Sequence, residues 1–381
     1  MKILFLVSSM NAGGAERVAA TLANAWSEGG AHVTLMPTYP HKQASFYALS
    51  PAVERVWLAD LYPPSRNRLR VTVRKIQALR DWVVQQQPDI IISFLTNVNV
   101  MALLATRGLD VPIIVCERSN PAVSRSSGPI LKGLRRLTYP WADAVTVQAG
   151  ASVEPFRKMV PGLQSLAVLP NPLPPELALA DRAPCVADNS GRRRLMAMGR
   201  LVPQKQFDVL IRSFSEVAAR YPDWDLVVWG EGPEREVLTE QIRQAGLAGR
   251  IFLPGSTEAP WTELIHANGF ALTSAVEGFP NALLEAMALG LPCIAFDCPS
   301  GPREMTQDGR DALLIEAGDD KAFTQGLADL MGDEALRAAL ADKAAYSVRE
   351  RYALPVVLRQ WDDLIAEARA SRLARNSGID A

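Results

Sequence analysis

Residues Ser274 to Pro292 read SAVEGFPNALLEAMALGLP. This stretch follows an apolar run, Phe270–Leu272, that is typical of a buried strand. The Pro-Asn step within it suits the first turn of a helix, and Gly290 suits its stop. The stretch therefore predicts a strand, a loop and a helix in succession, with Glu277 in the loop and Glu285 inside the helix.

The same alternation of strand and helix repeats along the chain. Short runs rich in Val, Ile and Leu are separated by longer amphipathic stretches, which predicts parallel sheets covered by helices. The fold class is therefore α/β. The expected strands are Ile3–Val7, Val33–Met36, Ile90–Ser93, Ile113–Cys116, Ala144–Val147, Leu195–Met198, Leu226–Trp229, Arg250–Leu253, Gly269–Leu272, Cys293–Ala295 and Ala312–Ile315.

A proline-rich segment divides these strands into two sets. Four prolines lie between Leu169 and Pro175, and they rule out a helix or a central strand there. We therefore expect two domains. The predicted bounds are 1–170 for the first domain, 171–194 for the linker, 195–352 for the second domain, 353–375 for a C-terminal helix and 376–381 for a tail.

The composition is that of a globular protein, with 48% hydrophobic and 21% charged residues among 381. Residues 1–170 hold 18 Lys and Arg against 10 Asp and Glu, whereas residues 171–381 hold 22 against 31. The basic first part favours an anionic partner, such as a phosphate-bearing substrate or a membrane surface, and an accidental spread of solubilising charge is the alternative. The four cysteines form no CxxC pair and no window reaches about 18 apolar residues, so we expect reduced thiols in a cytosolic protein without a membrane span.

Three glycine-containing loops follow predicted strands. The first reads NAGGAER, and its paired Gly13 and Gly14 allow backbone N–H groups to approach an anion at a helix start; a simple tight turn is the alternative. The second reads GRLVPQKQF, and its Arg200 and Lys205 are spaced to grip a diphosphate, unless they are solvated surface cations. The third, GEGPE from Gly230, is either another ligand-facing loop or a structural turn.

Glu277 and Glu285 flank the start of the predicted helix. Carboxylates accept hydrogen bonds from hydroxyl groups, and the N–H groups of a helix N-terminus attract a phosphate between them. This combination favours a sugar nucleotide as the ligand. A dinucleotide-binding protein is disfavoured because no G-x-G-x-x-G follows the first strand.

Together these motifs resemble glycosyltransferase family 4, whose members are retaining enzymes. The resemblance rests on EGFPNALLEAMA, GGAERV, GRLVPQK and GEGPE, which occur in the family's order over nearly the whole chain. It implies the GT-B fold, two Rossmann-like domains facing across a cleft, with the C-terminal helix packing back on the first domain. It also implies an enzyme that moves a hexose or N-acetylhexosamine from a nucleotide sugar, here expected to be UDP-linked.

The family's pattern assigns roles to individual residues. Arg200 and Lys205 would hold the donor diphosphate, Glu285 the ribose hydroxyls and Glu277 the donor sugar. Glu277, Arg200 and Lys205 are the expected catalytic residues. The other donor-binding residues implied by the resemblance are Gly13, Gly14, Gly230, Pro254, Gly278, Phe279, Pro280, Asn281 and Ala282. The family transfers through an oxocarbenium-like, same-face mechanism, so no covalent nucleophile is expected.

The segment Asp223-Trp-Asp225 has the D-x-D form that holds a divalent cation in sugar transferases of another fold. Here it precedes its predicted strand instead of following it. We interpret it as a solvated turn, and we expect no essential metal and no cofactor beyond the donor.

Basic stretches in the first domain indicate an acceptor side. Cations recur every fourth residue beside an apolar stripe, which is typical of a basic amphipathic helix at a membrane surface. The residues assigned to the acceptor or the membrane are Arg66, Arg70, Arg74, Lys75, Arg118, Arg135 and Arg136. Our hypothesis is that they meet a lipid-linked glycan at the anionic inner face of the cytoplasmic membrane; a core helix with a solvated basic face is the alternative. For Arg118, a structural salt bridge is equally open.

The segment DCPSGPRE, from Asp297 to Glu304, is similar to the members of the family that build surface polysaccharide or lipopolysaccharide on lipid carriers. No nucleic acid partner is expected. The alternative functions are a UDP-sugar epimerase on the same fold, an NAD-dependent oxidoreductase and a non-catalytic glycan-binding protein.

Overall fold

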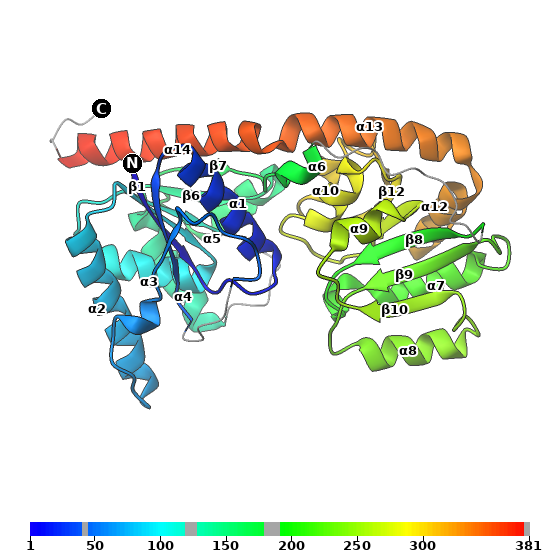
Figure 1. The fold of residues 1–381 in the computed structure, drawn as a ribbon, viewed down its shortest axis with the longest axis horizontal. Helices are drawn as coiled ribbons and strands as arrows, with labels where there is room; N and C mark the ends of the chain where they lie inside the picture. The colour runs from blue at the N-terminus through cyan, green and yellow to red at the C-terminus, as the bar shows by residue number, and fades with distance from the viewer. Residues whose placement is uncertain (40–44, 119–127, 179–190, 377–381) are drawn as a thin grey trace. The chain divides into compact units, whose positions relative to one another are not determined.

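The computed structural model describes residues 1–39, 45–118, 128–178 and 191–376. The chain forms two compact units, Met1–Pro172 with Val357–Ala381 and Leu173–Val356 (Figure 1). Each unit is a parallel β-sheet with helices on both faces, which confirms the predicted α/β class. Cys185 and residues 179–190 of the predicted linker lie outside the described residues, as do part of the segment after Arg118 and the tail beyond Asn376.

The first unit holds a seven-stranded sheet in the order β3-β2-β1-β4-β5-β6-β7. Its central strands are buried along their whole length because both faces are covered, and they therefore read as continuous apolar runs. The strands are β1 (Lys2–Val7), β2 (His32–Pro37), β3 (Glu54–Arg55), β4 (Ile90–Phe94), β5 (Ile113–Cys116), β6 (Ala144–Val147) and β7 (Leu166–Val168).

Two cores flank this sheet. Ile3 and Phe5 face α1 (Gly14–Glu28) and α14 (Leu354–Asn376). The part of α14 from Val357 onward belongs to this unit, and its Trp361 is buried. Leu4 and Leu6 face the helices on the opposite side. Those helices are α2 (Arg68–Gln86), α3 (Thr96–Thr106), α4 (Pro129–Thr138) and α5 (Val153–Met159), with short 3-10 turns at Leu58–Asp60, Tyr139–Trp141 and Gly150–Ser152.

The second unit holds a six-stranded sheet in the order β10-β9-β8-β11-β12-β13, and all its strand pairs are parallel. The chain runs outward from β8 in one direction, then returns to the middle and runs outward from β11 in the other. The strands are β8 (Arg193–Met198), β9 (Trp224–Trp229), β10 (Ile251–Gly255), β11 (Gly269–Leu272), β12 (Cys293–Asp297) and β13 (Leu313–Glu316).

Helices cover both faces of this sheet as well. One core lies under α7 (Phe207–Val217), α8 (Arg235–Gln244) and α12 (Asp320–Gly332), and the other under the remaining helices. The latter are α6 (Pro175–Ala178), α9 (Pro260–Ile265), α10 (Asn281–Ala288), α11 (Pro302–Met305) and α13 (Glu334–Tyr352), and a 3-10 turn spans Pro203–Lys205.

Every strand that the sequence predicts is present, and each differs from its predicted bounds by no more than a few residues. Two further strands, β3 and β7, are short and were not predicted. Cys116, Cys293 and Cys298 are buried and form no disulfide. Among the described helices, none is both long enough and apolar enough to cross a membrane.

Candidate functional site

The switch point of the second sheet lies between β8 and β11. The connections that leave these neighbouring strands turn to opposite sides, and in open α/β sheets this divergence creates the crevice that binds ligands at the carboxyl ends of the strands. The loop after β8 begins at Gly199, and the loop after β11 begins at Thr273. These are the two loops that carry the basic pair and the first glutamate of the sequence motifs.

An ion pair joins the two loops. Lys205 Nζ lies 2.5 Å from Glu277 Oε1, and the Ser274 hydroxyl donates a 2.6 Å hydrogen bond to the same oxygen. The Lys205 side chain is 21% exposed and that of Glu277 is 10% exposed. Because both groups are largely shielded from water, their attraction is stronger than that of a surface pair, and it fixes the position of both side chains.

Further hydrogen bonds connect the same two loops. Thr273 Oγ1 donates to the carbonyl of Lys205 over 2.9 Å, and the Ala275 N–H donates to the carbonyl of Gln204 over 2.9 Å. Gln204 Nε2 in turn donates to the carbonyl of Val276 over 2.7 Å. The two loops that form the walls of the crevice are therefore bonded to each other.

The second glutamate lies one turn inside α10, as the sequence predicts. Glu285 is 3% exposed, and Trp261 Nε1 of α9 donates a 3.0 Å hydrogen bond to its Oε2. Pro280 precedes the helix and provides no side-chain cap. The helix start at Asn281 thus presents backbone N–H groups and the positive end of the helix dipole beside the ion pair, an arrangement that suits a phosphate.

The loop after β12 supports this arrangement from behind. The Ser300 hydroxyl donates a 2.7 Å hydrogen bond to the carbonyl of Glu277. Gly301 has φ +108°, and a Cβ there would lie 2.5 Å from Pro280 Cδ. The DCPSGPRE segment therefore braces the glutamate loop, a role that the sequence did not reveal.

Close backbone packing shapes the loops after β8 and β9. A Cβ on Gly230 would lie 1.8 Å from the carbonyl oxygen of Gly199, and one on Gly232 would lie 2.2 Å from that of Leu201. The Gly230 N–H donates to the Gly255 carbonyl over 2.7 Å. The glycines of GEGPE are thus required for packing, and a contact of Gly230 with a ligand stays a prediction.

The remaining residues of the second unit that were assigned to the donor differ in their exposure. Arg200 is exposed directly after β8, and Pro254 is exposed within β10. Gly278 and Ala282 are half-buried, while Phe279 is buried and packs edge-on against Tyr352 with ring centroids 5.6 Å apart. Their contacts with a donor stay predictions.

A thiol lies close to the ion pair. Burial, with the Glu277 carboxylate nearby, raises the pKa of Cys298 to about 12. The thiol is therefore protonated at neutral pH and is a poor nucleophile.

Gly13 and Gly14 belong to the first unit, at the start of α1. The Gly13 N–H donates to the Tyr47 hydroxyl over 3.2 Å. Glu16 folds back over the turn, where Ser9 Oγ donates to its carboxylate and a Cβ on Gly13 would lie 2.3 Å from Glu16 Oε2. A carboxylate thus lies at this helix start, and the predicted phosphate contact of Gly13 and Gly14 stays a prediction.

The cations assigned to the acceptor or the membrane divide into exposed and buried groups. Arg66, Arg70 and Arg136 are exposed. Arg135 is 2% exposed and lies 3.8 Å from the Glu117 carboxylate, so its assignment to a basic surface is wrong: one member of the adjacent Arg-Arg pair faces the core. 

Two cations of α2 bind the unit's own backbone. Arg74 Nη1 donates to the carbonyl of Pro63 over 3.1 Å, and Lys75 Nζ donates to the carbonyl of Thr38 over 3.1 Å. Partial burial lowers the pKa of Lys75. Both side chains are therefore less available to a membrane than Arg66 and Arg70.

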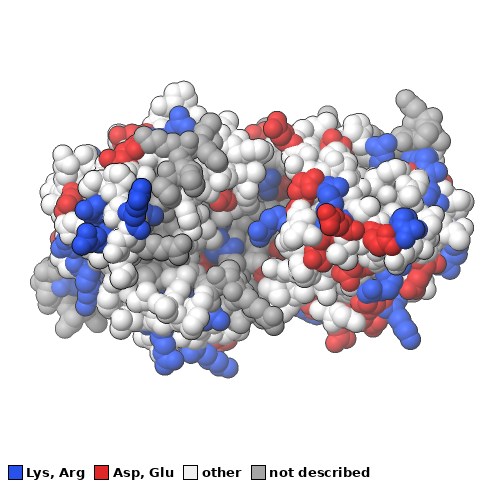
Figure 2. All heavy atoms as spheres, turned by 90° about the horizontal axis from the view of Figure 1, so that it is seen from below, with Lys and Arg blue, Asp and Glu red and all other residues white. Residues whose placement is uncertain are grey.

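Exposed apolar side chains accompany the exposed cations of α2 and α4. Leu69 and Val73 on α2 are 79% and 66% exposed, and Ile130 and Leu137 on α4 are 80% and 62% exposed. Both helices cover the same face of the first sheet. On the face shown in Figure 2, most of the Asp and Glu side chains belong to the second unit, in keeping with the uneven charge of the sequence.

The interpretation of the D-x-D segment as a solvated turn is wrong for Asp225, which lies inside β9 and is 6% exposed, whereas Asp223 lies in the turn before that strand. Asp223 lies 2.6 Å from Arg193, and Asp225 pairs with Arg192 and with Arg250, the latter at 3.0 Å. These ion pairs hold the start of β9 in place. The start of β9 lies at the amino ends of the strands, opposite the crevice.

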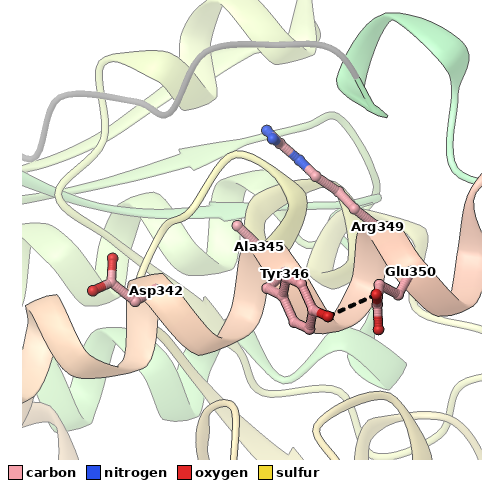
Figure 3. Close-up of a pocket in the computed structure, with 5 residues that line it drawn as sticks. All are labelled: Asp342, Ala345, Tyr346, Arg349 and Glu350. Atoms are coloured by element: carbon pink, nitrogen blue, oxygen red, sulfur yellow. Dashed lines mark hydrogen bonds between the residues drawn. The ribbon is translucent and has the colours of Figure 1, made fainter.

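A shallow depression on α13 is a separate feature (Figure 3). In it, the Tyr346 hydroxyl donates a 2.7 Å hydrogen bond to Glu350, and the neighbouring Arg349 donates to the carbonyl of Ala288 over 3.1 Å. None of Lys205, Glu277 and Glu285 lines the depression. The depression therefore does not belong to the crevice.

The chain is similar to known glycosyltransferases. Residues 13–172 match the model of the glycosyl transferase 4-like domain, and residues 186–346 match that of glycosyl transferases group 1. The chain is 26% identical over 371 residues to an α-1,4-N-acetyl-D-galactosaminyltransferase of Campylobacter jejuni that is named for the acceptor GalNAc-α-(1→4)-GalNAc-α-(1→3)-diNAcBac-PP-undecaprenol; the match covers 97% of this chain and 99% of the relative. It is also 24% identical over 353 residues to the lipopolysaccharide 1,6-galactosyltransferase of Salmonella typhimurium, covering 84% and 86% of the two chains.

Solved structures share the fold. The lipopolysaccharide outer core galactosyltransferase WaaB superposes with a TM-score of 0.74 at 21% identity over 96% of this chain and 99% of its own. HepE of Anabaena, solved with UDP-glucose, superposes with a TM-score of 0.77 at 19% identity over 97% and 100% of the two chains. The fold and the matched domains define a glycosyltransferase of the GT-B class. The chain belongs to the family 4-like glycosyltransferases of that class.

Proposed function

We propose that this enzyme transfers a hexose or N-acetylhexosamine, with retention, from a UDP-linked sugar to a lipid-linked glycan. The place of action is the inner face of the bacterial cytoplasmic membrane, in surface polysaccharide or lipopolysaccharide biosynthesis. The acceptor and the pathway are supported by the names of the Campylobacter and Salmonella relatives. The UDP-linked donor is supported by HepE, which was solved with UDP-glucose.

The observation that carries the proposal is the ion pair of Lys205 and Glu277 at the switch point, next to the start of α10. A donor diphosphate placed there meets the Lys205 ammonium, the exposed Arg200 and the helix N-terminus. The Glu285 carboxylate, oriented by Trp261, accepts hydrogen bonds from ribose hydroxyls. Glu277 accepts a hydrogen bond from a hydroxyl of the donor sugar.

The chemistry then depends on position and charge. As the bond from the sugar to the diphosphate breaks, negative charge grows on the leaving phosphate, and the fixed cations and helix dipole stabilise it. Holding donor and acceptor in a reactive geometry supplies a further large part of the rate. Because Cys298 is protonated at neutral pH and is a poor nucleophile, the proposed mechanism gives it no covalent intermediate.

The experiment that tests the proposal is nucleotide release from UDP-, GDP- and ADP-sugars, each with and without lipid-linked glycan extracted from bacterial membranes. We expect release from one UDP-sugar, stimulated by the extract and lost in Glu285→Gln. The anomeric configuration of the product, read by NMR, reports retention. Glu236→Gln, which removes an exposed carboxylate of α8 in the same unit, is the control and retains activity. Conversion of a UDP-sugar without any acceptor would establish the epimerase instead.

We also propose that no metal is required, because Asp223 and Asp225 are committed to arginine partners. Activity in excess EDTA equal to that in Mg²⁺ or Mn²⁺ is the expected result. A loss of activity that Mn²⁺ restores would contradict it.

Attachment to an anionic membrane is the third part of the proposal. Exposed leucine, isoleucine and valine side chains beside exposed arginines on α2 and α4 combine apolar area with positive charge. Each cation near an anionic bilayer contributes about 1 kcal/mol, and apolar burial adds to it. The two helices together support reversible attachment.

A further inference from the structure

Arg118 lies at the carboxyl edge of the first sheet, two residues beyond β5. Its guanidinium stacks on the ring of Phe94, 4.2 Å from the ring centroid, and Nη2 donates a hydrogen bond to Asn171 Oδ1. The same Asn171 oxygen accepts a 2.7 Å hydrogen bond from Gln148 Nε2. Phe94 ends β4, Gln148 follows β6 and Asn171 follows β7, so groups from three neighbouring strand ends hold this guanidinium.

No acidic group of the described chain balances the charge of Arg118. The Nε and Nη1 atoms of Arg118 are fully buried and have no hydrogen-bond partner among the described residues. Burial lowers the pKa of the guanidinium to about 10, which still leaves it charged at neutral pH. The structural salt bridge that the sequence left open is therefore not formed within the described part of the chain.

The adjacent carboxylate is committed elsewhere. Glu117 accepts hydrogen bonds from the Tyr139 hydroxyl over 2.5 Å and from the Thr96 hydroxyl over 2.9 Å. Arg135 lies 3.8 Å from it. These three partners satisfy Glu117 on the side of the sheet where α3 and α4 pack. Glu117 balances the charge of Arg135, so the charge of Arg118 is left in excess.

A buried guanidinium whose N–H groups have no hydrogen-bond acceptor and whose charge is not balanced lowers the stability of the fold, unless a ligand supplies the missing acceptors. The stack on Phe94 and the bond to Asn171 hold its planar fork in one orientation, which lowers the cost of binding a planar or tetrahedral oxyanion. We propose that Arg118 binds a phosphate group of the acceptor substrate. This inference rests on the proposed function, because the donor diphosphate is assigned to the edge of the second sheet.

The test measures binding of inorganic pyrophosphate, farnesyl diphosphate and farnesol by calorimetry, with saturating UDP present so that the donor site is occupied. The variants are Arg118→Met, which keeps the length and removes the charge, and Arg118→Lys. The control is Arg107→Met: Arg107 also lies over an aromatic ring of the first unit, 4.4 Å from the centroid of Trp141, but it precedes β5 and is exposed.

We expect farnesyl diphosphate to bind the wild type and to bind Arg118→Met at least tenfold more weakly. Arg118→Lys should give an intermediate loss, and Arg107→Met and the affinity for UDP should not change. Weak binding of pyrophosphate together with tight binding of farnesyl diphosphate would assign a lipid-linked phosphate, and equal binding of both would assign a phosphate without a required lipid. Either result supports the site.

Thermal unfolding separates binding from a structural role. If Arg118 serves a ligand, Arg118→Met keeps or raises the Tm, since an unbalanced buried charge is removed. A Tm that falls by several degrees while diphosphate binding is unchanged would overturn the proposal, as would equal binding of farnesol and farnesyl diphosphate. If no sugar donor is ever released but diphosphate binding still depends on Arg118, the anion site stands and the transferase assignment fails.

Discussion

The two sheets have related strand orders, yet the groups at their carboxyl edges are organised differently. At the edge of the second sheet, both glutamates have partners: Lys205 forms an ion pair with Glu277, and Trp261 donates a hydrogen bond to Glu285. At the edge of the first sheet, Glu117 is enclosed by its own partners and Arg118 is left without a carboxylate among the described residues. The second edge pairs its own charged groups, whereas the first edge holds a fixed positive charge that an anionic ligand can neutralise.

Under the proposed function, the two edges bind two different substrates. The proposed donor carries a diphosphate and several hydroxyls, which cations and carboxylates bind, and the second edge holds groups of both kinds. An acceptor phosphate needs only an oriented cation. Four variants or pairs of variants test this comparison of the two edges, and the largest effect is expected from the first.

Removing the carboxylate that orders the second edge should have the largest effect. Glu277→Gln leaves Lys205 without its counter-charge and Ser274 without its ionic acceptor, so we expect kcat to fall by about 100-fold or more. Steady-state nucleotide release measures this. Asp223→Asn, which alters an exposed ion pair of the same unit, is the control. Activity within twofold of the wild type for both variants would show that the ion pair does not matter.

Disturbing the backbone packing of the loops at the second edge should lower the free energy of unfolding of the protein. Gly230→Ala places a methyl group where the Gly199 carbonyl lies 1.8 Å away, and we expect a loss of about 3 kcal/mol in the free energy of unfolding. Urea unfolding gives the number. Gly246→Ala is the matched control, because Gly246 also has a positive φ, +69°, but its Cβ would meet no atom within 4 Å; it should cost about 1 kcal/mol. Equal losses in the two variants would refute the packing argument.

Removing apolar contact from the first unit should weaken membrane attachment. We expect Leu69→Ser with Leu137→Ser to lower binding to anionic vesicles by about tenfold, since both side chains are more than 60% exposed and lose apolar area. Vesicle sedimentation measures it, with neutral vesicles for comparison. Val237→Ser, which changes a 60% exposed residue of the second unit, should bind like the wild type. Equal binding to neutral and anionic vesicles would remove the electrostatic part of the account.

The smallest effect concerns the orientation of Glu285. Trp261→Phe removes one 3.0 Å hydrogen bond to that carboxylate and retains most of the ring. The loss of about 1 kcal/mol of interaction corresponds to a roughly fivefold weaker affinity for UDP. Trp82→Phe, a change in the first unit, is the control. An unchanged affinity in Trp261→Phe would mean that Glu285 is positioned by other contacts.

Most of the fold could be predicted from the sequence because strands covered on both faces appear as apolar runs. β3 was missed because its two residues, Glu54 and Arg55, are exposed and charged, and β7 because it has three half-buried residues. The helix start at Asn281 and the stop at Gly290 followed from local chemistry.

The site was predictable only in part. The motifs located Lys205 and Glu277, but their pairing joins residues 72 positions apart and depends on the strand order. The roles of Trp261, Ser274 and Ser300 were missed because no local pattern marks them. Arg135 was misassigned because its burial depends on Glu117, which lies in a different element. 

Calorimetric titration of UDP into the wild type, Lys205→Met and Glu285→Gln, with the Tm of each variant recorded, shows whether the carboxyl edge of the second sheet binds the donor. We expect UDP to bind the wild type and to bind each variant at least tenfold more weakly, with little change in Tm. Unchanged UDP affinity in both variants would contradict the claim that the carboxyl edge of the second sheet is the donor site.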